Sequence, residues 1–273
     1  MGVELMDFET LALRRDGPVL HVTLNRPEVR NAMSIAMVRE LRVVLAQQEL
    51  TQQTAGATRV IVLRGAGGHF CAGADLRDLA AARAQLAEKP DAVVAVNAAF
   101  GDLCVAYADT GLAVVAVLEG TVMGGGFGLA CVADVALAGT SAEFRLPETS
   151  LGVVPAQIAP FLVERLGFAE AKRLAVTGAR LNARAALDLR LVHEVHAASA
   201  LDRAVATVVG DILQCAPGAL AATKALIRKA RLHDASSLVH EAAETFARAA
   251  LGAEGIEGTT AFLQKRKASW VPQ

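Results

Sequence analysis

The chain of 273 residues lacks an excess of charge of either sign, since it has 27 Lys and Arg and 28 Asp and Glu. The net charge of −1 gives no reason to expect nucleic-acid binding. The first residues lack the basic and apolar segments of a signal peptide, and no apolar span long enough to cross a membrane runs free of charge or glycine. We therefore expect a cytoplasmic protein that neither crosses a membrane nor binds nucleic acid.

Cysteine and histidine are also scarce. The four cysteines, Cys71, Cys104, Cys131 and Cys215, are widely spaced in apolar sequence, which favours reduced thiols over disulfides or a metal site. The six histidines form no pattern of metal ligands. We therefore expect no bound metal.

Hydrophobic residues are plentiful at 53%, and in the first half they predict alternating strands and helices. Ser34 is a candidate N-cap for the first helix, and the strand at 60–64 is mostly apolar, as expected when both of its faces are covered. The alternation predicts an α/β fold with a parallel sheet. The expected strands are 19–24, 60–64, 114–118 and 132–137, and the expected helices are 35–50 and 91–108, with 76–87 either helix or loop.

The second half is rich in Ala and Leu, and its pattern is helical. We expect helices at 156–166, 169–176, 183–189, 201–213, 218–232, 236–250 and 255–267, and a short strand within 191–196. These patterns divide the chain into an α/β core at 1–195 and a helical region at 196–273. The helical region carries more apolar surface than it can cover alone, so we expect it to pack against other subunits.

Two glycine-containing turns carry the strongest chemical signal. Gly124-Gly125-Gly126 and Cys71-Ala72-Gly73-Ala74-Asp75 each follow an apolar strand and lead into sequence that can be helical. Glycine allows close backbone approach, and a helix start presents free N–H groups. If the two turns face one point, they supply a pair of donors for a developing oxyanion. The Pro147-Glu148 pair adds a carboxylate.

These motifs, in this order, resemble those of the crotonase superfamily, the enoyl-CoA hydratases and isomerases. The resemblance implies a spiral of repeated β-β-α units, a helical trimerisation region, and a homotrimer or a hexamer made of two trimers. It also implies an acyl-CoA thioester substrate and no cofactor, because coenzyme A is part of the substrate. The matching segments are 24–33, 69–76, 124–126, 146–155 and 261–267.

The resemblance implies a role for residues in each motif. The backbone N–H groups of Ala74 and Gly125 would form the oxyanion hole, and Glu148 would be the acid/base. The other residues expected to bind substrate or CoA are Val29, Arg30 and Ala32 in the first motif, Ala72, Asp75, Leu76 and Arg77 in the second, Gly128, and Lys265 from a neighbouring subunit. For Arg77 and Lys265 the alternative is a solvated surface charge.

The chain departs from the best-known hydratases at one position. Those enzymes carry a second glutamate two residues after the third glycine of the turn, and here that position is Gly128. No acid nearby replaces it, so acid–base chemistry would rest on Glu148 alone. A hydratase in which Gly128 frees volume for a 3-substituted enoyl group is one interpretation, and the stretch 155–161 resembles hydratases of methylglutaconyl-CoA and isohexenylglutaconyl-CoA.

Two other functions remain open at this stage. An isomerase needs one base to move a proton between C2 and C4 of an acyl-CoA, which also fits a lone glutamate. A catalytically weak acyl-CoA-binding protein would keep the oxyanion hole and lose the chemistry. A nucleotide-dependent dehydrogenase is disfavoured, because Leu129 and Cys131 stand where the last glycine of the dinucleotide motif would fall.

Overall fold

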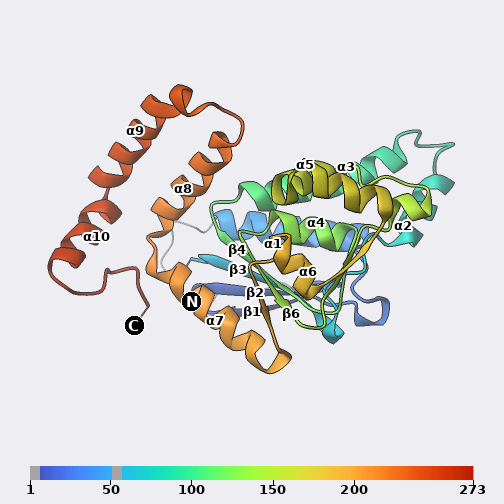
Figure 1. The fold of residues 1–273 in the computed structure, drawn as a ribbon, viewed down its shortest axis with the longest axis horizontal. Coiled ribbons are helices and arrows are strands. Elements are labelled where there is room, and N and C mark those ends of the chain that lie inside the picture. Colours follow the sequence, from blue (N-terminus) through green and yellow to red (C-terminus); the bar gives the residue numbers. More distant parts are fainter. Residues whose placement is uncertain (1–6, 51–56, 273) are drawn as a thin grey trace.

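The computed structural model describes residues 7–50 and 57–272, which form two sheets surrounded by helices (Figure 1). The strands are β1 Leu11–Asp16, β2 Val19–Leu24, β3 Val60–Gly65, β4 Ala113–Leu118, β5 Thr121–Met123, β6 Val135–Gly139, β7 Glu143–Arg145, β8 Arg180–Asn182 and β9 Glu194–His196. The α-helices are α1 Ile35–Leu50, α2 Leu76–Ala84, α3 Ala92–Asp109, α4 Gly125–Val132, α5 Ala159–Thr177, α6 Ala183–Asp188, α7 Ala198–Gln214, α8 Pro217–Ala230, α9 Ala235–Leu251 and α10 Ala253–Leu263. Short 3-10 helices are η1 Pro27–Val29, η2 Ala66–Gly68 and η3 Glu148–Leu151.

The chain alternates between the two sheets, and this alternation makes a spiral. The large sheet has the order β1-β2-β3-β4-β6-β9, parallel from β2 to β9, and the small sheet has the order β5-β7-β8. One strand of each sheet precedes a helix in β4-β5-α4 and again in β6-β7-α5. Single bridges between Met33 and Ala74 and between Cys71 and Val122 extend the small sheet to the earlier turns. The predicted α/β spiral of β-β-α units is thereby confirmed.

The large sheet is buried on both faces, which explains its continuous apolar strands. Along β3, Ile61 and Leu63 face a core shared with α1, α3 and α4, whereas Val60 and Val62 face α7. Leu201 and Val205 of α7 complete that second core. Figure 1 shows α1, α3, α4 and α5 on one side of the sheet and α7 on the other.

The structure differs from the sequence-based elements mainly around the small sheet. The strand expected at 132–137 begins at Val135, because Val132 still belongs to α4, a buried helix that is apolar all round and gives no helical period. The two helices expected at 156–166 and 169–176 are one element, α5, interrupted at Gly167, whose φ is 75°. The short strands β5, β7 and β8 are too brief to show a pattern of their own.

The last three helices form an arm that projects from the sheet (Figure 1). Ion pairs join α8 to the core: Lys224 Nζ lies 2.6 Å from Asp134 Oδ2, and Arg228 pairs with Asp109. Because α7 packs on the sheet, the arm defined by α8, α9 and α10 begins at Pro217. The division at 195 and 196 stays a prediction.

One described helix, α3, has the length and apolar composition of a membrane-crossing segment, with a mean hydropathy of 1.4. It packs against α1, α2 and α4, and its Leu103, Cys104 and Tyr107 are fully buried. These contacts give α3 the role of a layer helix over the sheet. The expectation that no segment crosses a membrane stays a prediction.

Candidate active site

The two glycine turns predicted from the sequence meet in the small sheet. The N–H of Cys71 donates to the carbonyl of Thr121 at 2.9 Å, and the N–H of Met123 donates to the carbonyl of Cys71 at 2.9 Å. Gly73 and Gly124 follow these strands with φ values of 96° and 49°, a region that favours glycine. A Cβ on Gly124 would lie only 3.4 Å from the Cα of Gly73, so the two backbones touch.

Each turn leaves one amide donor free. Gly125 is the first residue of α4, and Ala74 precedes Asp75, the N-cap of α2. Within residues 7–50 and 57–272, no acceptor binds the N–H of Ala74 or Gly125, although the N–H of Asp75 donates to Met33 at 3.0 Å. Both donors sit at helix N-termini, where the helix dipole favours negative charge. The pair can therefore stabilise an oxyanion.

Glu148 places a carboxyl group beside these donors. It opens η3, and a Cβ on Gly124 would lie 3.1 Å from its Oε1. Its Oε2 is buried without a hydrogen-bond partner. Burial raises the pKa of Glu148 above its ordinary value, against a smaller opposing effect from its own backbone. A carboxyl group of this kind can both accept and return a proton near neutral pH.

These groups open into a cavity of about 620 Å³, a typical size for a small-molecule site. Its walls come from α1, α2, α3 and residues 152–158, and they are mostly apolar. Of the predicted site residues, Ala74, Asp75, Leu76, Gly125 and Glu148 line it. No Lys, Arg or His is among the described lining residues.

Four predicted residues do not line this cavity: Val29, Arg30 and Ala32 of the first motif and Ala72 of the second. Ala72 donates its N–H to the carbonyl of Arg30 at 3.0 Å, so the two motifs are joined by backbone. Val29 ends η1, and Arg30 follows it, exposed, with a φ of 51°. Ala32 accepts a hydrogen bond from Arg26. Their predicted contact with CoA stays a prediction.

Asp75 and Arg77 bind each other. Asp75 caps α2 by accepting the N–H of Arg77 at 3.1 Å, and its Oδ2 lies 2.9 Å from Arg26 and 3.0 Å from Arg77. The hydrogen bonds from Arg77 and Arg26 lower the pKa of Asp75 to about 2. The Arg77 side chain is 70% exposed, so its outer face is still open to an anion.

Gly128 lies next to two residues of the cavity wall, Ile158 and Phe100. It is buried and is not among the residues that line the cavity, because Ile158 covers it. A Cβ on Gly128 would lie 2.4 Å from Ile158 Cγ2 and 3.4 Å from Phe100. The branched side chain of Ile158 therefore lies where a side chain at position 128 would begin, and the expectation that Gly128 frees pocket volume stays a prediction.

Lys265 lies on the arm, two residues after α10, in an exposed position with a φ of 53°. Figure 1 shows α10 and the cavity helices α2 and α3 at opposite ends of the molecule. Lys265 of the same chain is therefore far from the cavity. The predicted contact with CoA requires a neighbouring subunit and stays a prediction.

Several cavity residues were not found from the sequence. Phe100 and Asn97 lie on α3, and Gln157 and Ile158 lie in the segment before α5. A Cβ on Gly125 would lie 3.2 Å from Phe100, so the ring sits against an oxyanion donor. The α3 sequence is apolar on most sides, so no period marked the face that lines the cavity.

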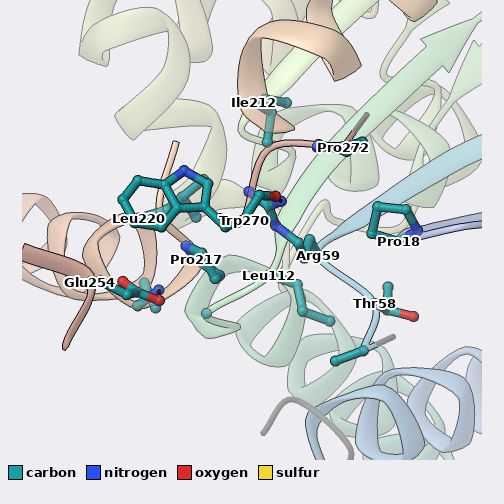
Figure 2. Close-up of a pocket in the computed structure, with 14 residues that line it drawn as sticks. Pro18, Thr58, Arg59, Leu112, Ile212, Pro217, Leu220, Glu254, Trp270 and Pro272 are labelled. Carbon is teal, nitrogen blue, oxygen red and sulfur yellow. Dashed lines mark hydrogen bonds between the residues drawn. The ribbon is translucent and has the colours of Figure 1, made fainter. Parts of the chain in front are cut away.

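A second cavity, of about 580 Å³, lies where the arm leaves the core (Figure 2). Both of its charged residues are engaged. Glu254 accepts the first amides of α8, from Gly218 at 3.0 Å and Ala219 at 3.1 Å. Arg59 donates to the carbonyl of Trp270 at 2.7 Å and to that of Cys215. These contacts fix the junction between arm and core.

Comparison with known proteins gives one consistent result. Residues 14–273 match the family model described as enoyl-CoA hydratase/isomerase. The crystal structure of an enoyl-CoA hydratase/isomerase from Marinobacter aquaeolei is 47% identical, with a TM-score of 0.92 over 97% of this chain and 100% of that one. The structure of Pseudomonas aeruginosa AtuE is 50% identical, with the same TM-score and coverage. The carnitinyl-CoA dehydratase of Proteus mirabilis is 31% identical over 96% of this chain and 98% of its own length.

Proposed function

Because the chain belongs to the enoyl-CoA hydratase/isomerase family, we propose that it adds water across the 2,3 double bond of a 2-enoyl-CoA thioester. One observation carries this proposal. The Oε2 atom of Glu148 is buried and has no hydrogen-bond partner. Glu148 lines the mostly apolar cavity together with Ala74 and Gly125, whose backbone N–H groups are free. That arrangement fits a reaction in which an enolate forms and a single carboxylate moves the proton.

The geometry supports a sequence of two proton transfers. Ionised Glu148 takes a proton from water while the water oxygen bonds to C3 of the enoyl group. The electron pair of the double bond moves onto the thioester oxygen, where the N–H groups of Ala74 and Gly125 stabilise the negative charge. The enolate then collapses and C2 takes the proton from Glu148. Water is consumed, and Glu148 returns to its ionised form.

The acyl group in our proposal is substituted at C3, as in the glutaconyl type. Two observations support this choice. The stretch 155–161 resembles hydratases of methylglutaconyl-CoA and isohexenylglutaconyl-CoA, and the part of the cavity wall formed by α2 and α3 is mostly apolar. Val93, Val96 and Leu79 supply an apolar wall for a branch.

Isomerisation of a 3-enoyl-CoA is the second candidate. In that reaction Glu148 would take a proton from C2, and the resulting dienolate would regain it at C4. The lack of a second carboxylate at Gly128 favours it, because an isomerase needs no water activation. A catalytically weak acyl-CoA-binding protein remains the third candidate.

We also propose that the protein assembles as a homotrimer or as a hexamer of two trimers. The arm carries large apolar side chains that its own chain leaves open to solvent. Phe246 is 75% exposed and Phe262 is 84% exposed. Exposed apolar surface of this kind is typical of a subunit interface.

A panel of enoyl-CoA thioesters tests the reaction. Hydration removes the absorbance of the conjugated thioester, and isomerisation of a 3-enoyl-CoA creates it. Glu148→Gln should lower turnover by about 10⁴-fold, the upper end for a general acid/base, and leave CoA-ester binding nearly unchanged. Turnover within a few-fold of the wild type would exclude Glu148 as the acid/base.

A further inference from the structure

A hydrogen-bonded pair of side-chain amides interrupts the apolar wall of the cavity. Gln157 Nε2 donates to Asn97 Oδ1 at 2.8 Å, and both residues line the cavity. Asn97 lies on α3, whereas Gln157 lies in the segment that connects η3 to α5. Asn97 is exposed and Gln157 is half-buried, so both amides can meet a ligand that enters the cavity.

The position of the pair is built into the surrounding chain. A Cβ on Gly101 would lie 2.1 Å from Gln157 Oε1, so glycine at that position leaves room for the amide. The next residue after Gln157 is Ile158, which is buried against Gly128. Gly101 therefore gives the amide of Gln157 its space, and the buried Ile158 fixes the backbone next to it.

The pair has donors to spare. After the bond between them, both N–H groups of Asn97 Nδ2 and one of Gln157 Nε2 have no acceptor among the described residues. The other polar side chains of the wall are carboxylates, apart from Ser34. Asp78 accepts the N–H of Ile35 at 2.7 Å, and Asp75 binds Arg26 and Arg77. Apart from the amide pair, the hydroxyl of Ser34 is the one neutral side-chain donor among the described lining residues.

The distance from the reacting atoms suits a substituent of the acyl group. Asn97 lies three residues before Phe100 on α3, which is about one helical turn, or roughly 5 Å. The ring of Phe100 packs against Gly125, one of the two oxyanion donors. A group carried a few bonds beyond C3 would therefore reach the amides.

We propose that Asn97 and Gln157 bind an oxygen acceptor, such as a carboxylate, on the branch of the acyl group at C3. This inference rests on the proposed function, because it names what that cavity selects. Neutral amide donors are the available partners, since no described lining residue is Lys, Arg or His. Hydrogen bonds to a charged group are the stronger kind, so a carboxylate gains more than a neutral oxygen.

The test compares two esters that differ by one carboxylate, 3-methylglutaconyl-CoA and 3-methylcrotonyl-CoA. The wild type should prefer the first. Asn97→Leu and Gln157→Met should each lower the ratio of kcat/KM for the two esters by about 10- to 100-fold. Asn97→Asp keeps the shape and adds a negative charge, so it should lower the rate with the carboxylate ester and spare the other. Gln85→Leu is the control, because this exposed amide at the end of α2 is not among the lining residues.

Binding separates this inference from the proposed function. Titration calorimetry with the saturated esters 3-methylglutaryl-CoA and isovaleryl-CoA needs no turnover. A wild-type preference for 3-methylglutaryl-CoA that Asn97→Leu removes supports the amide pair, even if no ester is hydrated. An unchanged ratio in both Asn97→Leu and Gln157→Met, or a wild type that does not prefer the carboxylate ester, overturns it. Circular dichroism of each variant confirms that it is folded before either ratio is taken.

Discussion

Glu148 is the residue whose ionisation should govern activity. Hydration needs its carboxylate, so kcat/KM should rise with pH on one limb and then level off, without the falling limb that a second acid would add. Because burial raises the pKa of Glu148, the midpoint of that limb should lie above the ordinary glutamate value of 4.5. A pH profile of kcat/KM checks this. A midpoint at or below that value would show that another group controls the rate.

The same pKa shift predicts an effect on stability. A carboxyl group whose pKa is higher in the folded state than in the unfolded state binds more protons when folded, so stability falls as pH rises between the two values. Glu148→Gln removes the buried charge and should therefore raise the melting temperature at pH 8. The gain should shrink as pH falls and should disappear below 4.5, the ordinary glutamate value, where the wild-type side chain becomes protonated in both states. Calorimetric melting at both pH values measures it.

Gly128 and Ile158 should behave as a coupled pair, because a Cβ on Gly128 would meet Ile158 Cγ2 at 2.4 Å. Gly128→Glu alone should cost about 1–3 kcal/mol of stability through overpacking. Adding Ile158→Ala makes room, so the double variant should be more stable than Gly128→Glu. It should also hydrate crotonyl-CoA faster than Ile158→Ala, since it carries a second carboxylate. Melting temperatures and kcat/KM check both expectations, and a single variant as stable as the wild type contradicts the pairing.

At the scale of elements, the proposed oxyanion hole is built at the N-terminal ends of two helices, α2 and α4. Proline at Gly125 removes one N–H at the first position of α4, where a helix tolerates proline. Gly125→Pro should therefore fold and lose about 10²- to 10³-fold in kcat. Gly125→Ala is the matched control, because it keeps the N–H and brings its Cβ only 3.2 Å from Phe100. Equal losses in the two variants would show that crowding by Phe100, and not the lost donor, is responsible.

The sequence predicted the elements whose pattern is local. The strand at Val19–Leu24 and the helix at Ile35–Leu50 agree with the structure at every residue, and Ser34 does accept the N–H of Met37 at 3.2 Å. The sequence also predicted that Ala74, Gly125 and Glu148 belong to one site, because each of them lies in a short motif that can be recognised locally. The amide pair and the cover of Ile158 over Gly128 join positions far apart in the chain. Spacing in one sequence carries no information about such contacts.

On the scale of the whole molecule, the core and the arm have different chemistry. The core buries most of its large apolar side chains, although some, such as Phe168 and Val176, are exposed. The helices of the arm bury only Ala261, and the arm exposes Ile227, Leu232, Val239, Phe246, Leu251, Ile256, Phe262 and Leu263. Between them lies a junction held by hydrogen bonds, where Arg59 binds the carbonyls of Leu213 and Cys215 at the end of α7 and Glu254 caps α8. A junction that orients an apolar arm away from its own core is consistent with assembly through that arm.

Assembly would also explain how Lys265 can serve a site at the other end of its own chain. Light scattering at micromolar concentration should show a trimer or a hexamer. Replacing Phe246 and Phe262 with Glu should dissociate it, because two buried apolar contacts would become charged.

If a neighbouring Lys265 binds the phosphates of CoA, Lys265→Ala should raise KM several-fold in the assembled protein. In the dissociated Phe246→Glu/Phe262→Glu protein the same change should have no further effect, because the partner is already gone. A KM increase of equal size in both backgrounds would place Lys265 outside the neighbouring site, and a stable wild-type monomer would remove the cross-subunit contact altogether.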